Sequence, residues 1–125
     1  MRRRWRVTFI AALIALAWIP SSSGFTIPAR PDGYVTDKAG MLSAQTRSQL
    51  EAGLADFERK TSTQIVVATF PSLDGESLED VSIRLAEKWK IGQKGKDNGV
   101  IFLIFKEDRK MRIEVGYGLE GALPD

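Results

Sequence analysis

Two runs of apolar, β-branched residues constrain the fold of this chain more than any other feature. Gln64 to Phe70 reads QIVVATF and Gly99 to Phe105 reads GVIFLIF, a composition typical of strands that are buried on both faces. An amphipathic helix is expected between them, after the N-cap residue Ser77. Its apolar stripe comprises Leu78, Val81, Leu85 and Trp89. This strand–helix–strand order has the length of a parallel crossover, so we expect an α/β fold around two central parallel strands.

The remaining segments add a second helix and an antiparallel hairpin. A helix is expected from the N-cap Ser43 to about Lys60. Its apolar face comprises Leu50, Leu54 and Phe57. A very short strand is expected at residues 34–35, and Met111 to Val115 alternates apolar and polar residues, as half-exposed strands do. Because only a short turn separates this last strand from the second apolar run, the two form a hairpin and the sheet is mixed.

The first 24 residues have the layout of a secretory signal peptide. Four arginines precede an apolar run from Val7 to Ile19, Pro20 breaks the run, and small residues follow. The run has 13 residues, which is short for a membrane span of about 20 residues, and an uncleaved membrane anchor is the alternative. We expect cleavage near Gly24, with Ser22 and Gly24 at positions −3 and −1, and then an extended arm over residues 25–32.

Removing the leader changes the charge of the chain. The whole sequence holds 18 basic and 16 acidic residues; the leader holds four of the basic residues and no acidic ones, which leaves 14 basic against 16 acidic. Domains that bind nucleic acid usually present a basic face, so we expect no nucleic-acid partner. The expected location is periplasmic, or membrane-associated on the outer side of the cytoplasmic membrane.

The chain contains no cysteine and no histidine. These absences exclude disulfides, thiolate nucleophiles, a Ser-His-Asp triad and a zinc site with cysteine or histidine ligands. A metal ion can be bound only through oxygen ligands, which favours calcium, magnesium or manganese.

The expected hairpin brings acidic residues from separate parts of the sequence to one end of the sheet. Asp97 precedes the first hairpin strand and must lie close to the end of the second, because antiparallel neighbours meet in this way. Glu120 and Asp125 follow that strand, and Asp37 can join them if the first strand runs antiparallel to the first hairpin strand. Such carboxylates suit a hard divalent cation. The alternative is that these residues only form turns and helix starts.

Two nucleotide-binding motifs are present only in part. The G-x-G-x-x-G match at Gly116–Gly121 follows the second strand of a hairpin, whereas the dinucleotide fingerprint opens a first β–α turn. Gly95-Lys96 is followed by Asp97 and not by the Ser or Thr of a P-loop. We therefore expect no nucleotide ligand.

Five blocks of the sequence together resemble the TPM domain family, which is known from thylakoid-lumen photosystem-repair proteins and from exported bacterial proteins. The blocks follow the family's order and cover about residues 33–125. They are VTDKAGMLS (35–43), TSTQIVVAT (61–69), PSLDGES (71–77), WKIGQKGKDNGV (89–100) and DRKMRIEVGYGLEGALPD (108–125).

The resemblance implies a three-layer α/β/α sandwich with a mixed sheet and a divalent cation, commonly calcium, in a groove at one end of it. The family's acidic positions match Asp37, Asp97, Glu120 and Asp125. Some plant members are described as acid phosphatases. The resemblance therefore implies an exported, cation-binding interaction or quality-control module whose unidentified protein partner can be membrane-associated, or else a metal-dependent phosphatase-like hydrolase.

In the family, the domain continues through further helices past the position of Leu123–Asp125. We therefore expect residues 33–125 to be a C-terminally truncated TPM domain without its C-terminal helices. One face of the sheet would then expose apolar surface. A general module that binds apolar surfaces is a third functional interpretation.

Overall fold

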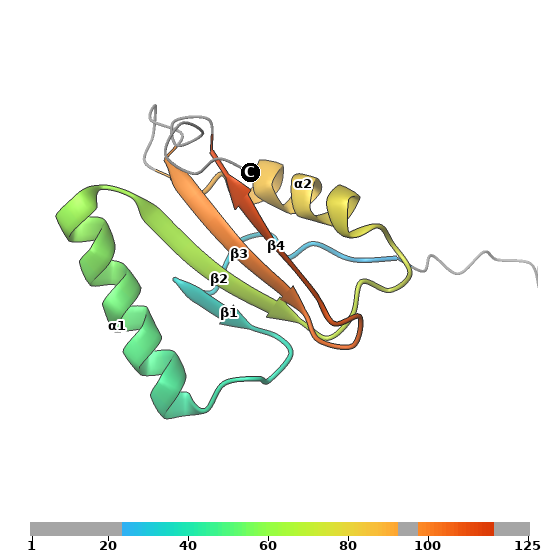
Figure 1. Ribbon diagram of the computed structural model, residues 1–125, viewed down its shortest axis with the longest axis horizontal. Coiled ribbons are helices and arrows are strands. Elements are labelled where there is room, and N and C mark those ends of the chain that lie inside the picture. The colour runs from blue at the N-terminus through green and yellow to red at the C-terminus, as the bar shows by residue number, and fades with distance from the viewer. Residues whose placement is uncertain (1–23, 93–97, 117–125) are drawn as a thin grey trace, which may run out of the picture.

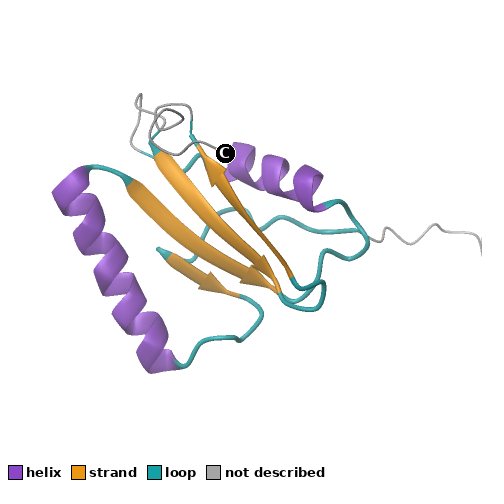
Figure 2. Cartoon of the chain, viewed as in Figure 1, coloured by secondary structure: helices purple, strands orange, loops and turns teal. Residues whose placement is uncertain are grey.

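A computed structural model describes residues 24–92 and 98–116, which form a four-stranded mixed sheet and two helices (Figure 1). The strands lie in the order β1-β2-β3-β4, with β1, β2 and β3 parallel and β4 antiparallel to β3. The sheet lies between α1 and α2 (Figure 2), which confirms the predicted α/β fold. The elements are β1 (Val35–Asp37), α1 (Ala44–Thr61), β2 (Gln64–Phe70), α2 (Leu78–Trp89), β3 (Gly99–Phe105) and β4 (Lys110–Val115).

The two apolar runs pair residue for residue at the centre of the sheet. Gln64 of β2 is the partner of Gly99 of β3, and the register continues without a shift to Phe70 and Phe105. The parallel crossover and the hairpin expected from the sequence are both confirmed. Both helices begin at the predicted N-caps: the Ser43 side chain accepts from the N–H of Thr46, and the Ser77 side chain accepts from the N–H of Asp80.

The hydrophobic core lies between the sheet and α2. Alternate residues of β2 and β3 point toward the buried stripe of α2. The buried core residues of these three elements are Val66, Ala68, Phe70, Ile101, Leu103, Phe105, Val81, Leu85 and Trp89. The extended arm also belongs to this core, because the Phe25 ring packs edge-on against Phe70 with centroids 4.9 Å apart. The indole N–H of Trp89 donates to the carbonyl of Pro28 over 2.9 Å and holds the arm in place.

Helix α1 covers the sheet less completely than α2 does. It packs against β2 and β1, and none of its residues is buried. Leu50 and Leu54 are half-buried, whereas Phe57, expected on the same apolar face, is 40% exposed. The apolar face predicted for this helix is therefore only partly used. Within residues 24–92 and 98–116, neither helix combines the length and hydropathy of a membrane-spanning segment.

The face of β3 and β4 turned away from the α2 core presents apolar side chains to solvent. We call Phe102, Ile104, Met111 and Ile113 the β3–β4 apolar strip. Ile113 is the register partner of Phe102, and Met111 that of Ile104. Met111 is 58% exposed and Ile113 52% exposed. Among the described residues, this face of the hairpin therefore carries exposed apolar side chains.

The exposure of the strip can be tested by comparing the two faces of the hairpin. We expect Met111→Thr and Ile113→Thr to change the free energy of unfolding by no more than about 0.5 kcal/mol, because exposed side chains contribute little. Leu103→Ala, at a fully buried position of β3, is expected to cost about 2–5 kcal/mol. Urea unfolding measures all three. A loss at Met111 or Ile113 as large as that at Leu103 would show that the strip is covered.

Candidate functional site

The two ends of the sheet carry different polar residues. We call the end at which β1, β2 and β3 finish, at Asp37, Phe70 and Phe105, the carboxyl end of the sheet. The opposite end, where β2 and β3 begin and β4 finishes, is the amino end of the sheet. The sequence predicts that acidic residues gather at the amino end.

At the amino end, several segments are joined by short polar contacts. The N–H of Gly116 donates to the carbonyl of Gly99 over 2.9 Å, so the segments that leave β3 and β4 here are neighbours, as the hairpin argument predicts. The carbonyl of Asn98 accepts from the N–H of Gln64 over 3.2 Å, and the Asn98 side-chain amide donates to the carbonyl of Ser62 over 2.5 Å. Asn98 therefore connects the start of β3 to the segment before β2.

Two glycines allow the backbone segments at the amino end to approach closely. A Cβ atom on Gly99 would lie 2.0 Å from the carbonyl oxygen of Ile91, and one on Gly92 would lie 2.8 Å from the nitrogen of Gly99. Gly92 also has φ +123°, which a side chain would strain. Backbone packing therefore fixes the start of β3 against Ile91 and Gly92, which follow α2.

The three acidic residues predicted at this end belong to segments that adjoin the described residues in the sequence. Asp97 directly precedes Asn98, and Glu120 and Asp125 follow Gly116. All three lie outside the described residues. The structure therefore describes the adjacent backbone of both hairpin strands, and the cation site stays a prediction for these three positions.

Asp37 lies at the carboxyl end of the sheet. Asp37 could join the other acids only if β1 ran antiparallel to β3. Instead, β1 is parallel to β2, and β2 is parallel to β3. The end of β1 therefore lies at the opposite end of the sheet from Asn98 and Gly116. The physical reason is the β1–α1–β2 connection, in which an 18-residue helix returns the chain to start a parallel strand.

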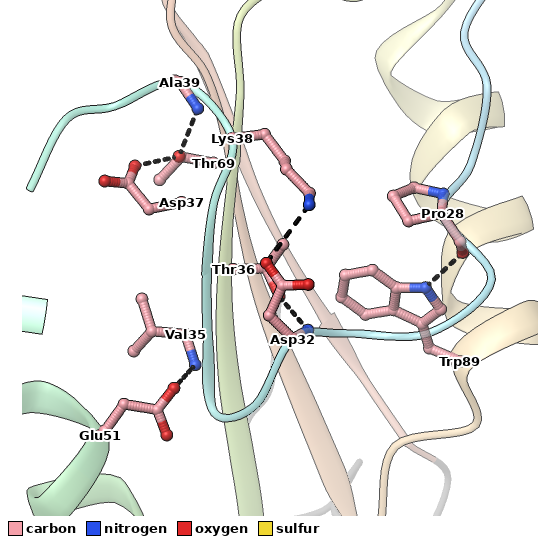
Figure 3. A network of polar contacts seen from close by, with 10 residues as sticks. All are labelled: Pro28, Asp32, Val35, Thr36, Asp37, Lys38, Ala39, Glu51, Thr69 and Trp89. Carbon is pink, nitrogen blue, oxygen red and sulfur yellow. Dashed lines mark hydrogen bonds and ion pairs between the residues drawn. The ribbon is translucent and has the colours of Figure 1, made fainter. Parts of the chain in front are cut away.

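The Asp37 carboxylate is occupied by hydrogen bonds that hold the loop before α1 (Figure 3). Its Oδ1 accepts from the Thr69 hydroxyl over 2.5 Å and from the N–H of Met41 over 2.9 Å, and its Oδ2 accepts from the N–H of Leu42 over 2.9 Å. A carboxylate offers about four acceptor positions, and three are used here. We therefore assign Asp37 to the structure of this loop and omit it from the candidate cation ligands.

The environment of Asp37 favours its charged form. Burial acts to raise the pKa of the carboxyl. The hydrogen bonds from Thr69, Met41 and Leu42, together with the positive charge of Arg47, act in the opposite direction. They outweigh burial, so the pKa of Asp37 lies below its usual value.

The Thr69 hydroxyl completes this hydrogen-bonded arrangement. This hydroxyl donates to Asp37 and accepts from the N–H of Ala39 over 3.1 Å (Figure 3), although the Thr69 side chain is 2% exposed. The Thr69 carbonyl accepts from the N–H of Lys38 over 2.9 Å. The sequence signal for this role is one hydroxyl within an otherwise apolar run, and the apolar pattern alone does not predict it.

Glu51 performs a similar task for the start of β1. Its carboxylate accepts from the N–H groups of Tyr34 and Val35 over 3.1 and 2.8 Å. A Cβ atom on Gly33 would lie 2.8 Å from this carboxylate, so the glycine makes room for it. The Tyr34 hydroxyl donates to Glu58 over 2.6 Å. This bond, with burial and the charges of Glu58 and Glu51, raises the pKa of Tyr34.

The Asp37 and Glu51 carboxylates accept hydrogen bonds from backbone N–H groups. In the part of the chain that the structure describes, no group of three or more acidic side chains is arranged to hold a metal ion. The sequence-based prediction for Asp97, Glu120 and Asp125 concerns positions beyond the described residues.

Comparisons with known proteins agree with this fold. Residues 35–125 match the sequence model of the TPM domain. The solved N-terminal domain of a protein from P. gingivalis is 36% identical, with a TM-score of 0.67 over 74% of this chain and 59% of that one. The solved N-terminal domain of a protein from Corynebacterium glutamicum is 22% identical, with a TM-score of 0.57 over 80% of this chain and 61% of that one. At that identity the second likeness shows the fold alone.

This chain therefore spans about three fifths of the length of either solved structure. A comparison with curated proteins finds no match.

The structural role of Asp37 predicts a loss of stability that depends on pH. Because its pKa is lowered in the folded state, its contribution is present above the unfolded pKa of about 3.9 and is lost as the pH falls through the folded value. We expect Asp37→Asn to cost about 1–3 kcal/mol at pH 7 and less as the pH falls below about 4.

The matched control is Asp32→Asn. The Asp32 carboxylate forms only an exposed ion pair with Lys38 at 3.3 Å, and such pairs contribute about 0–1 kcal/mol. Urea unfolding of both variants and of the wild type across this pH range measures the differences. A constant difference between wild type and Asp37→Asn at every pH would contradict the role assigned to the Asp37 charge.

Proposed function

The chain belongs to the TPM domain family, and from this premise we propose that it is an exported domain that binds a divalent cation, calcium in preference to magnesium or manganese. We propose further that it acts as an interaction or quality-control module. The observation that carries the proposal is the β3–β4 pairing, in which the N–H of Gly116 donates to the carbonyl of Gly99 at the amino end of the sheet.

The proposed ligands are Asp97, Glu120 and Asp125. They stand in the sequence on either side of the hairpin whose ends are neighbours, which supports a shared site. Because the chain has no cysteine or histidine, the donors are carboxylate and carbonyl oxygens, the ligands that calcium prefers at roughly six to eight positions. Bound there, the cation would neutralise the mutual repulsion of the carboxylates and tie the two strand ends together.

We propose binding, rather than catalysis, as the function of this domain. Asp37, Glu51 and Glu58 accept hydrogen bonds that organise β1 and its neighbouring loops, so none of them is available as a general acid or base beside the hairpin. A phosphatase would need its metal to polarise the phosphate, since the chain offers no histidine or thiolate for the purpose. Metal-dependent hydrolysis of phosphate esters is the alternative function, and the assay below detects it.

The export proposal rests on the leader. Its basic start, its short apolar run and its small residues up to Gly24 are the features of a signal peptide. The near balance of charge in residues 25–125 agrees with a protein partner, including one at a membrane, rather than with nucleic acid.

Calorimetric titration of the folded, exported protein with Ca²⁺ tests the cation site. We expect a dissociation constant of roughly 10⁻⁴–10⁻³ M, typical of extracellular calcium modules. Asp97→Asn and Glu120→Gln should each weaken binding by about tenfold or more, or about 1.4 kcal/mol.

Asp74→Asn is the matched control for that titration. Asp74 is an exposed acid in the loop after β2, at the other end of the sheet, and its φ of +53° is one that Asn tolerates. The affinity of the Asp74→Asn variant for Ca²⁺ should equal that of the wild type. No heat from the folded wild type, or an equal loss in all three variants, would overturn the proposed site.

An assay of phosphomonoester hydrolysis separates binding from catalysis. We expect no turnover above buffer with Ca²⁺, Mg²⁺ or Mn²⁺. Turnover that rises with the bound metal and disappears in Asp97→Asn would instead identify a metal-dependent hydrolase and replace the module as the function.

A further inference from the structure

Glu76, in the loop before α2, connects the start of the extended arm to that helix. Its Oε2 accepts from the backbone nitrogen of Phe25 over 2.5 Å, and its Oε1 pairs with the guanidinium of Arg84 on α2. The Glu76 side chain is 31% exposed and the Arg84 side chain 44% exposed. The Glu76 carboxylate therefore lies between the backbone nitrogen of Phe25 and the guanidinium of Arg84.

The position of the Phe25 nitrogen is set by packing within the domain. The Phe25 ring is 9% exposed and lies edge-on to Phe70 and Phe105, with centroids 4.9 and 5.8 Å away. The Trp89–Pro28 hydrogen bond holds the arm three residues later. These contacts all involve residues 25 and beyond, so the nitrogen stays beside Glu76 whatever precedes it in the chain.

Gly24 lies on the other side of the same peptide bond and has a backbone conformation that favours glycine. It has φ +149°, and a Cβ atom there would lie 2.7 Å from Oε2 of Glu76. Only glycine fits at this position in an intact chain. In the sequence, Ser22 and Gly24 are also the small residues at the −3 and −1 positions of the expected leader cleavage site.

We propose that the Gly24–Phe25 peptide bond is the processing site of the leader and that Glu76 binds the amino terminus created there. This rests on the export proposed above. A leader peptidase of the exporting cell hydrolyses the bond with one water molecule; Gly24 keeps the new carboxylate and Phe25 gains a protonated amine. The single amide donor beside Glu76 becomes an ammonium group, and the hydrogen bond becomes charge-assisted.

The charges around this nitrogen favour the ammonium form. Among the described residues, the Glu76 carboxylate accepts its hydrogen bond, and Arg84 pairs with the far oxygen of Glu76. The nearer group is negative, so the processed amine should hold its proton to a higher pH than an ordinary amino terminus, for which the pKa is about 7.7–8.0. Processing then locks the arm onto the core through Phe25.

Expression of the full chain in a secreting bacterium and intact mass measurement of the exported product locate the new terminus. We expect the product to begin at Phe25. Gly24→Ala keeps a small residue at −1, so it should give a product of identical mass and identical unfolding. If residue 24 were retained, the alanine would be strained at the φ of +149° and would destabilise the product. An exported product that begins elsewhere overturns the processing site and leaves export standing; a retained leader on a non-exported chain removes both.

Titration of the Phe25 α-amine by NMR tests the role of Glu76. We expect its pKa to be at least about one unit higher in the wild type than in Glu76→Gln, which is a tenfold change in proton affinity. Glu79→Gln, at an exposed position in the first turn of α2, is the matched control and should titrate like the wild type. Equal pKa values in the wild type and Glu76→Gln would contradict the binding of the terminus by Glu76. The calcium titration is independent of either result.

Discussion

The in-register parallel pairing of β2 and β3 determines the arrangement of everything else in this domain. It aligns Phe70 with Phe105 and Gln64 with Gly99, so that all loops following the parallel strands leave from one end and the hairpin strands open at the other. Burial of the apolar residues on the α2 side stabilises the pairing. Two chemically distinct ends of the sheet follow from this one register.

Carboxylates at the described loops of this sheet serve mainly as acceptors for backbone N–H groups. Asp37 and Glu51 each accept from two consecutive residues, Glu76 accepts from Phe25, and Asp108 accepts from the N–H of Leu73 over 2.7 Å. Each bond satisfies a backbone N–H group, which would be costly to leave unpaired. Charge in this part of the protein is used to fix loops, which separates it from the acids that we assign to the cation.

The sequence predicts the strands, the helices and the hairpin because local periodicity and capping determine them. The direction of β1 could not be read in this way: β1 has only three residues, and its pairing depends on how α1 returns the chain. The role of Asp37 was missed for the same reason, since its partner Thr69 lies 32 residues away. The exposure of Phe57 has a different cause. A helical stripe predicts which face of α1 is apolar but not how much of that face the sheet covers.

We propose that the cation lies at the amino end of the sheet and that the acids of the carboxyl end take no part in binding it. Titration of the labelled, exported protein with Mn²⁺, observed as broadening of individual amide signals, distinguishes the two ends. A site at the amino end should broaden the signals of Asn98, Gly99 and Gly116 first, while those of Met41 and Leu42 persist and excess Ca²⁺ restores the spectrum. Early broadening at Met41 and Leu42, with Gly116 unaffected, would contradict this placement of the cation.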